Sequence, residues 1–198
     1  MTYRRKDTYY RRAKAAGYRA RSAYKLIELD RRFGLLRRGD FVVELGAWPG
    51  GWLQVARERA GPEGMVIGVD LASIEPLGTD GISVLAGDVR DPAVIAAILT
   101  AMGRPADVVL SDLAPKLTGI QATDEARREE LVDALLSSLG TLLRPGGRLL
   151  TKLFMDPGYA TQISRLRERF LTVRSTRPES TRRGSAEMYV IGEGHRTA

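Results

Sequence analysis

The sequence predicts an α/β fold, in which a mostly parallel sheet of seven strands carries helices on both faces and ends in an antiparallel hairpin. Two observations lead to this prediction. Short apolar segments alternate with segments of helical periodicity along most of the chain, which is typical of parallel sheets. The last two apolar segments follow each other with no helix between them, which indicates a hairpin at one edge.

The N-terminal region precedes the first strand. Residues 1–17 have no clean period and predict a mobile arm or a frayed helix. Helical spacing then runs over residues 22–33, with Ser22 as the expected cap. Gly34 ends this helix and leads towards the sheet.

The first strand, expected at residues 41–45, runs into a glycine corner. The stretch reads F-V-V-E-L-G-A-W-P-G-G-W. A short apolar run is followed by Gly46, Gly50 and Gly51, and helical spacing resumes from Trp52. A strand, a glycine turn and a helix start commonly cradle a nucleotide, although a plain strand–turn–helix junction remains the alternative here.

The rest of the chain continues the alternation. Pro92 stands at a favoured first helical position after Asp91, Asp124 is expected to cap the longest helix, and residues 145–147 (P-G-G) predict a turn. Strands are expected at 65–70, 82–86, 106–111, 148–154, 171–175 and 188–191, and helices at 91–102, 124–143 and 157–170. Residues 113–123 are expected to form a loop.

Composition limits the classes of function. The 198 residues are 43% hydrophobic, which suits one domain with a core, and no run approaches the ~20 apolar residues of a membrane span. The chain has no cysteine and a single histidine, His195, in what reads as the C-terminal tail. Thiol catalysis, disulfides and a zinc site are therefore not expected. The arginine-rich start lacks the apolar region of a secretory signal, so we expect a cytoplasmic, metal-free protein.

Charge is concentrated at the N-terminus. Residues 1–38 contain 13 Lys or Arg against Asp7, Glu28 and Asp30, a local net of +10, so the rest of the +7 chain sums to −3. A basic segment on a mildly acidic body predicts nucleic-acid binding, with a solvated tail as the alternative. Tyrosines that can stack on unpaired bases interleave with these charges: Tyr3, Tyr9, Tyr10, Tyr18 and Tyr24.

Polar residues follow the expected parallel strands where ligands of such sheets bind. They are Glu44, Asp70, Asp88 and Asp112, with Lys152 near the end of the fifth strand. A dinucleotide is disfavoured, because Trp48 stands where the G-x-G-x-x-G pattern needs glycine and Glu44 would repel a diphosphate. An acid at this corner suits the ammonium and sulfonium of S-adenosylmethionine.

Individual roles follow from these positions. Asp70 is placed to hold the ribose hydroxyls of an adenosyl group, and Asp88 could accept the amine of adenine. Lys152, in L-L-T-K-L-F, is costly to bury unless it is paired or used, although it could also extend to solvent from an edge strand. Burial and a nearby sulfonium would both favour the neutral amine that a general base needs, and a carboxylate such as Asp112 would orient it.

Four short motifs resemble the Lys-Asp-Lys-Glu tetrad of FtsJ-like ribose 2′-O-methyltransferases. They are S-A-Y-K-L at Lys25, S-D-L-A-P at Asp112, T-K-L-F at Lys152 and S-A-E-M-Y at Glu187. The glycine corner, G-D-V-R-D and R-P-E-S-T-R-R-G-S-A-E are also similar to that family, in the same order from about residue 18 to 191. Two residues depart from its pattern: Glu44 replaces the usual Asp, and Trp48 replaces a small residue.

The resemblance implies a Rossmann-like fold, S-adenosylmethionine as methyl donor and Lys152 as the base. It implies that Asp112 and Glu187 hold the amines and that Lys25 adds positive charge. The cofactor contacts are then expected at Glu44, Gly46, Gly50, Gly51, Trp52, Asp70, Asp88 and Asp112. This short form is similar to the bacterial heat-shock members that methylate a uridine in large-subunit ribosomal RNA.

The expected organisation is a basic arm at 1–17 and one methyltransferase domain at 18–198, acting as a monomer without metal or membrane. Phosphate contacts are expected from the arm and from Arg174, Arg177, Arg182 and Arg183. Only RNA carries the 2′-hydroxyl, so this chemistry selects RNA over DNA. The alternatives left open are a transfer-RNA or messenger-cap ribose as target, a non-catalytic RNA-binding or ribosome-assembly factor, and a nicotinamide oxidoreductase, which Trp48 disfavours.

Overall fold

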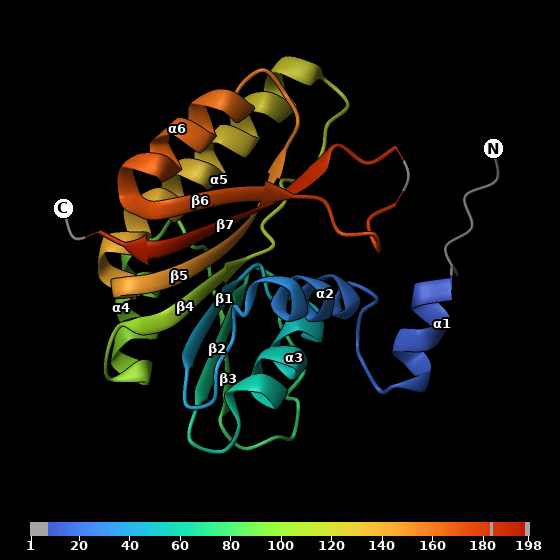
Figure 1. The fold of residues 1–198 in the computed structure, drawn as a ribbon, viewed down its shortest axis with the longest axis vertical. Coiled ribbons are helices and arrows are strands. Elements are labelled where there is room, and N and C mark those ends of the chain that lie inside the picture. Colours follow the sequence, from blue (N-terminus) through green and yellow to red (C-terminus); the bar gives the residue numbers. More distant parts are fainter. Residues whose placement is uncertain (1–7, 183, 197–198) are drawn as a thin grey trace.

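The fold is a single seven-stranded sheet between two layers of helices (Figure 1). It is seen in a computed structural model that describes residues 8–182 and 184–196. The strands are β1 (Phe41–Leu45), β2 (Met65–Asp70), β3 (Ile82–Ala86), β4 (Ala106–Ser111), β5 (Leu143–Phe154), β6 (Phe170–Thr176) and β7 (Glu187–His195). The helices are α1 (Thr8–Ala15), α2 (Ala23–Phe33), α3 (Gly51–Ala60), α4 (Pro92–Met102), α5 (Gln121–Leu142) and α6 (Tyr159–Arg169).

The strand order is β3-β2-β1-β4-β5-β7-β6. Strands β1 to β5 pair in parallel, and β7 is antiparallel to both β5 and β6. The chain reverses its direction of winding between β1 and β4, the switch point at which open α/β sheets bind ligands. The expected α/β class and the antiparallel edge are thereby confirmed.

Strand periodicity divides the core into two clusters, one on each face of the sheet. Odd-numbered positions of β1, such as Val43 and Leu45, pack with α4, α5 and α6. The even-numbered Val42 packs with α2 and α3, as do Leu150 of β5 and Tyr189 of β7. Side chains that share this second face are therefore directed towards α2.

Several expected boundaries need correction. Asp124 does not cap the longest helix: α5 begins at Gln121, and the Asp124 carboxylate instead accepts hydrogen bonds from the backbone N–H groups of Thr118 and Gly119. Ser22 precedes α2 without a side-chain capping bond, because residues before it already form helix-like turns. Residues 145–147 lie within the span of β5, and α6 begins at Tyr159.

Two further residues stand differently from what was expected. His195 ends strand β7 rather than lying in a tail, and its ring packs 5.3 Å from that of Phe170. Thr8–Ala15 of the expected arm forms helix α1, whereas Tyr3 and the other residues before Thr8 lie outside the described part of the chain. The Asp91 cap and Pro92 at the helix start are confirmed, since the Asp91 carboxylate accepts from the Ala93 N–H.

The glycine corner depends on close packing between β2 and α3. A Cβ atom on Gly68 would lie 2.7 Å from a methyl group of Leu53 and 2.9 Å from Cβ of Ala47. Gly140, in the helical backbone of α5, would meet nothing within 4 Å.

We predict opposite effects of alanine at these two glycines. Gly68→Ala should lower the free energy of unfolding by about 1–3 kcal/mol, because the overpacked methyl group forces β2 and α3 apart. Gly140→Ala should raise it by about 0.5–1 kcal/mol, because glycine is a poor helix former. Urea denaturation of both variants checks the prediction, and equal effects would contradict the packing described here.

Candidate active site

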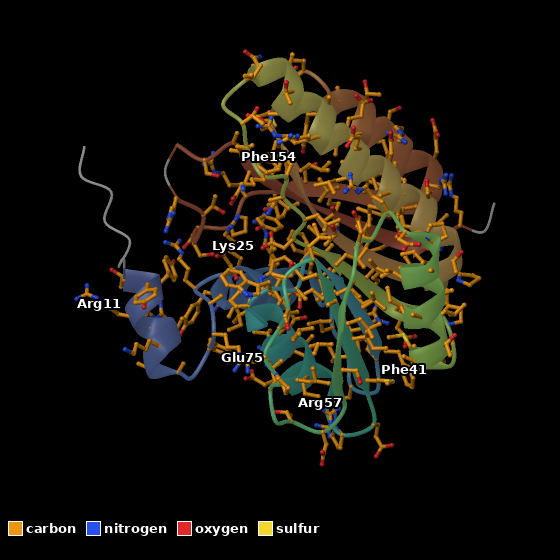
Figure 2. The ribbon with its side chains drawn as sticks, turned by 180° about the vertical axis from the view of Figure 1, so that it is seen from behind. Arg11, Lys25, Phe41, Arg57, Glu75 and Phe154 are labelled. Carbon is orange, nitrogen blue, oxygen red and sulfur yellow. The ribbon has the colours of Figure 1, made fainter. Side chains whose placement is uncertain are left out.

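The predicted tetrad residues come together at the carboxyl ends of β4 and β5. Asp112 follows β4, Lys152 lies in β5 and Glu187 begins β7. Lys152 shares the sheet face of Leu150, and this face is covered by α2, which supplies Lys25. Figure 2 shows Lys25 between its helix and the C-terminal strands. Four segments far apart in sequence thus meet at one place.

The four side chains form two ion pairs. Lys152 Nζ lies 3.0 Å from Asp112 Oδ1, and Lys25 Nζ lies 2.7 Å from Glu187 Oε2. Lys152 Nζ also donates to the backbone carbonyl of Asp112 at 2.9 Å. Two of the three donors of a Lys152 ammonium are therefore directed at a single residue.

Tyr189 joins the two ion pairs and was not predicted as a site residue. Its hydroxyl donates to Asp112 Oδ1 at 3.1 Å and accepts from Lys25 Nζ at 3.1 Å. The side chain is fully buried, and its ring lies 6.0 Å from that of Trp52. A sequence signal existed, because Tyr189 lies two residues after Glu187 in the same strand and hence on the same face.

Burial raises the pKa of both Glu187 and Tyr189, whereas the neighbouring charges lower that of Glu187 and raise that of Tyr189 further. Burial alone would raise the pKa of Glu187, but the hydrogen bond and charge of Lys25, with the charges of Lys152 and Arg182, outweigh it and hold this pKa below its ordinary value. The pKa of Tyr189 is raised well above its ordinary value, first by burial and then by the negative charges of Asp112 and Glu187. Glu187 is thus an anion and Tyr189 a neutral hydrogen-bonding bridge at neutral pH.

The Lys152 amine is buried, and its hydrogen-bonding partner is Asp112. Its side chain is only 7% exposed, compared with 22% for Asp112. The edge-strand interpretation is wrong for this lysine, because β5 lies between β4 and β7 inside the sheet. An amine in this position requires compensation, which Asp112 provides through both its carboxylate and its carbonyl.

A pocket of 320 Å³ lies on the other side of Asp112, along the ends of β1, β2 and β3. Its lining includes these residues: Gly46, Trp48, Asp70, Leu71, Ala72, Asp88, Arg90 and Asp112. Three of the predicted strand-end carboxylates, from Asp70, Asp88 and Asp112, therefore line one cavity. It lies at the carboxyl ends of the strands, where open α/β sheets bind their ligands.

The carboxylates of Asp70 and Asp88, like that of Asp112, have partners within the protein. Asp70 accepts hydrogen bonds at 2.9 Å from the backbone N–H groups of Trp48 and Ala72, which fixes the glycine corner against β2. Asp88 forms a side-chain pair with Arg90, with an Nη2–Oδ2 distance of 2.6 Å. This pair lowers the pKa of Asp88, so the carboxylate stays ionised, and an adenine amine would have to share it with Arg90.

The environment of Glu44 indicates whether the site suits a cationic ligand. The residue is 2% exposed, and its Oε2 atom has no hydrogen-bond partner. Its pKa is raised well above the ordinary value, first by burial and then by the negative charges of Asp112 and Asp70. A buried carboxylate among like charges lacks a cation, and the ammonium of S-adenosylmethionine is the kind of group that would supply one.

The glycines of the corner bring the strand ends together. Gly46 has φ +83°, and a Cβ atom there would lie 3.0 Å from the backbone nitrogen of Leu113. This close approach places the end of β1 directly beside Asp112. Gly50 precedes α3 with φ +106°, and a Cβ atom on Gly51 would lie 3.0 Å from Cβ of Ala20.

Trp52 supports the tetrad from behind. Its side chain is 1% exposed, and the indole N–H donates to the carbonyl of Ser22 at 2.8 Å. Trp52, Glu44, Gly50 and Gly51 are not among the residues that line the 320 Å³ pocket. Their direct contact with a cofactor stays a prediction.

A second, basic pocket of 510 Å³ opens on the opposite side of the tetrad. It is lined by these residues: Arg21, Ser22, Lys25, Arg182, Gly184, Ser185 and Glu187. The tetrad thus stands between two cavities, because Asp112 belongs to the first and Lys25 and Glu187 belong to the second. Arg21 is a basic residue that the sequence marked only as part of the N-terminal charge.

The basic N-terminal segment packs beside this second pocket. Tyr9 of α1 lies 5.8 Å from Tyr24 of α2, and the Arg12 guanidinium lies 4.8 Å from the Tyr24 ring centre. These rings are partly used in packing between the two helices. Arg11 points away from the body of the protein (Figure 2) and is exposed.

The arginines predicted near the C-terminus have different positions. Arg182 lines the basic pocket, whereas Arg177 donates to the carbonyl of Ser185 at 2.5 Å and orders the loop before β7. Arg174 is paired with Glu193. Arg183 lies outside the described residues.

Residues 8–182 and 184–196 contain neither a group of potential metal ligands nor a helix that could cross a membrane. No three or more acidic or histidine side chains in this part of the chain are grouped to hold a metal ion. None of its helices is long and apolar enough to span a bilayer.

The chain is similar to methyltransferases in both sequence and structure. Residues 18–195 match the FtsJ-like methyltransferase family. A relative from Methanothrix thermoacetophila, named ribosomal RNA large subunit methyltransferase E, is 48% identical, over 98% of this chain and 74% of its own length. A crystal structure of a Plasmodium falciparum protein assigned as a ribosomal RNA methyltransferase superposes with a TM-score of 0.80 at 25% identity, covering 90% of this chain and 98% of that one.

A more distant likeness concerns the fold alone. Fibrillarin from Aeropyrum pernix, solved with natively bound S-adenosyl-L-methionine, has a TM-score of 0.60 at 16% identity, covering 80% of this chain and 68% of that one.

The unpartnered Glu44 carboxyl predicts a pH-dependent stability. Its neutral form stabilises the free protein fully below the ordinary pKa of 4.5, and this contribution is lost as pH rises through the raised pKa of the folded state. Glu44→Gln cannot ionise. Its free energy of unfolding relative to the native sequence should therefore increase between about pH 5 and about pH 8, by at most about 1.4 kcal/mol per pH unit.

Glu187→Gln is the matched control, measured by urea denaturation over the same range. The pKa of Glu187 is lowered, so its stabilisation is lost only as pH falls through that low value. Its difference from the native sequence should stay flat between about pH 5 and about pH 8. A flat profile for Glu44→Gln as well would contradict the raised pKa.

Proposed function

Because this chain belongs to the FtsJ-like methyltransferase family, we propose that it methylates the 2′-oxygen of a ribose in large-subunit ribosomal RNA. The fold is that of Rossmann-like methyltransferases, and S-adenosylmethionine is the methyl donor. The observation that carries the proposal is the arrangement of Lys25, Asp112, Lys152 and Glu187 between two cavities. One cavity suits a cationic nucleoside, and the other suits a polyanion.

The cofactor binds, in this proposal, in the 320 Å³ pocket that Asp112 shares with the strand ends. Asp70 and Asp88 would hold its nucleoside part, and Glu44 would face its ammonium. When bound, S-adenosylmethionine supplies a methyl group on a sulfonium that a nucleophile can attack. The glycine corner would bring the backbone close to the ligand.

The acceptor ribose enters, we propose, from the basic 510 Å³ pocket. Arg21 and Arg182 would bind the phosphates beside the target nucleotide, which places the ribose hydroxyl at the tetrad. Holding the hydroxyl in line with the methyl group removes much of the entropic part of the barrier.

Lys152 is the proposed base. As a neutral amine it would accept the proton of the ribose hydroxyl, and the methyl group for the ribose oxygen would come from S-adenosylmethionine held by Asp70, Asp88 and Glu44. Asp112 orients the amine through the contacts at 2.9 and 3.0 Å. Lys25, paired with Glu187 and bridged by Tyr189, adds positive charge to the tetrad.

Large-subunit RNA as the substrate is supported by the name of the Methanothrix relative, which covers nearly the whole chain. A uridine as the target base, a monomeric enzyme and a cytoplasmic location are further parts of the proposal. The family match begins at residue 18, which supports treating residues 1–17 as an arm beside a domain at 18–198.

The other candidates are less well supported. A transfer-RNA or cap ribose would use the same tetrad, because the tetrad acts only on the hydroxyl. A purely RNA-binding factor has no need for a lysine that is 7% exposed and held by two contacts to Asp112. A dinucleotide would place its diphosphate against the carboxylates of Asp70 and Glu44.

We predict that Lys152→Ala reduces single-turnover methyl transfer to large-subunit particles by about 10²–10⁴-fold at saturating cofactor. S-adenosylmethionine affinity, measured by calorimetry, should stay nearly unchanged. Lys152→Arg should fail as well, because a guanidinium stays protonated. Glu187→Ala should be milder, because Glu187 orients charge without exchanging the proton.

Two controls separate catalysis from structure. Lys116→Ala removes an exposed lysine outside both pockets and should retain full activity. Added methylamine should restore part of the Lys152→Ala rate and none of the Lys152→Arg rate. Near-normal transfer by Lys152→Ala would show that the lysine is not the base.

The exposed charges of the arm give a separate prediction about RNA affinity. Arg11→Gln should lower the slope of log affinity against log salt by roughly 0.7–0.9, the effect of one lost phosphate contact. Removal of residues 1–17 should lower it further. Both variants should bind S-adenosylmethionine as the native chain does, and an unchanged salt slope would identify the arm as a solvated tail.

A further inference from the structure

Two large apolar side chains are exposed on the rim of the cofactor pocket. Trp48 is 61% exposed and Leu71 is 73% exposed, and both line the 320 Å³ cavity. They approach it from different elements, Trp48 from the glycine corner after β1 and Leu71 from the end of β2. Exposed aromatic residues next to a ligand cavity commonly belong to the ligand's binding surface.

The backbone under these side chains is fixed. The Trp48 N–H donates to Asp70 Oδ2, and the Ala72 N–H donates to Asp70 Oδ1, both at 2.9 Å. One carboxylate therefore ties the indole-bearing turn to the segment that carries Leu71. The side chains above it stay free to settle on a ligand, because most of their surface contacts solvent.

The cavity is small for the ligand it is expected to bind. At 320 Å³ it lies at the lower end of the roughly 300–1,000 Å³ typical of small-molecule pockets. Such pockets bury about 70–90% of their ligand, so a nucleoside held here needs additional cover. Trp48 and Leu71 are large apolar residues of the rim, and most of their surface is exposed and could contact a ligand.

We propose that Trp48 and Leu71 fold over the adenosyl half of S-adenosylmethionine and form an apolar cover for it. This inference rests on the proposed function and adds a specificity-determining contact to it. The cover lies beside Asp70, the carboxylate that is proposed to hold the nucleoside, so it would contact the uncharged adenosyl group. The indole presents a large flat surface to the ligand.

A contact with the nucleoside has a distinctive consequence for ligand preference. S-adenosylmethionine and S-adenosylhomocysteine share the adenosyl group and differ in charge at sulfur. Loss of the indole should therefore weaken both ligands by the same factor. A cation–π contact with the sulfonium would instead weaken S-adenosylmethionine selectively.

Tryptophan fluorescence reports the contact directly, because the chain has two tryptophans. Trp52 is 1% exposed and serves as an internal reference, whereas Trp48 is 61% exposed. S-adenosylhomocysteine should quench the native emission and shift it to shorter wavelength as Trp48 leaves water. In Trp48→Phe, only the buried Trp52 emits and the ligand-induced shift should disappear.

Calorimetry measures the effect on affinity. Trp48→Ala should raise the Kd of both S-adenosylmethionine and S-adenosylhomocysteine about tenfold, the scale of a lost stacking contact. Leu71→Ala should raise both several-fold. Leu117→Ala is the matched control, since Leu117 is also 61% exposed but does not line this pocket, and its Kd should equal that of the native chain.

Three results would contradict the proposal that Trp48 and Leu71 cover the adenosyl group. They are unchanged Kd values in Trp48→Ala, a loss confined to S-adenosylmethionine, or an emission change caused by RNA alone and not by either cofactor. The last result would make Trp48 a platform for an RNA base. Failure of the native chain to bind S-adenosylmethionine at all would contradict the proposed function itself, so the two failures are distinguishable.

Discussion

The candidate active site depends on one constraint, the compensation of a lysine amine buried inside a sheet. Lys152 lies in β5, between β4 and β7, with 7% of its side chain exposed. Leaving such an amine without partners would cost several kcal/mol. Asp112 removes this cost with two contacts, and its position follows from the glycine corner, where the missing Cβ of Gly46 lets β1 approach the backbone at Leu113.

Tyr189 connects the Lys152–Asp112 pair to the Lys25–Glu187 pair. Its hydroxyl stands between Asp112 and Lys25, so the two ion pairs form one hydrogen-bonded chain. Trp52 packs against the Tyr189 ring and is itself held by Ser22, three residues before Lys25. Helices α2 and α3 therefore support the chemistry as well as the core. This hydrogen-bonded chain lies between a pocket lined by acidic residues and a basic pocket. The first would suit a cationic methyl donor, and the second would suit an anionic acceptor.

Glu44 shows how function and stability oppose each other at this site. Its buried, unpartnered carboxyl among Asp70 and Asp112 destabilises the free protein whenever it ionises. The same feature prepares the pocket for an ammonium group, because binding would supply the missing charge. In the proposed complex, a residue that is unfavourable for folding alone would become favourable.

The sequence predicted most of the site because parallel strands place their carboxyl ends at one edge. Asp70, Asp88 and Asp112 could be located by this rule alone, and the resemblance located Lys25 and Glu187. Tyr189 was missed because its role requires the strand pairing of β7 with β5, which periodicity does not supply.

Local alternatives also escaped prediction. Asp124 ties a loop in place of capping α5, and Arg90 takes up the carboxylate of Asp88. His195 belongs to β7 because the final strand runs further than its apolar residues indicate. For Asp124 and Asp88, a hydrogen-bond partner a few residues away decided between structures that the local sequence leaves open.

In the proposed function, the tetrad acts on a ribose hydroxyl. The most direct measurement is mass spectrometry of nucleosides from large-subunit RNA, methylated by the purified protein with isotopically labelled S-adenosylmethionine. We expect the label in a 2′-O-methylated nucleoside, which alkaline hydrolysis releases only within an alkali-resistant dinucleotide because the methylated 2′-oxygen cannot attack the adjacent phosphate. Label in a base-methylated nucleoside, with an unmodified ribose, would contradict the account.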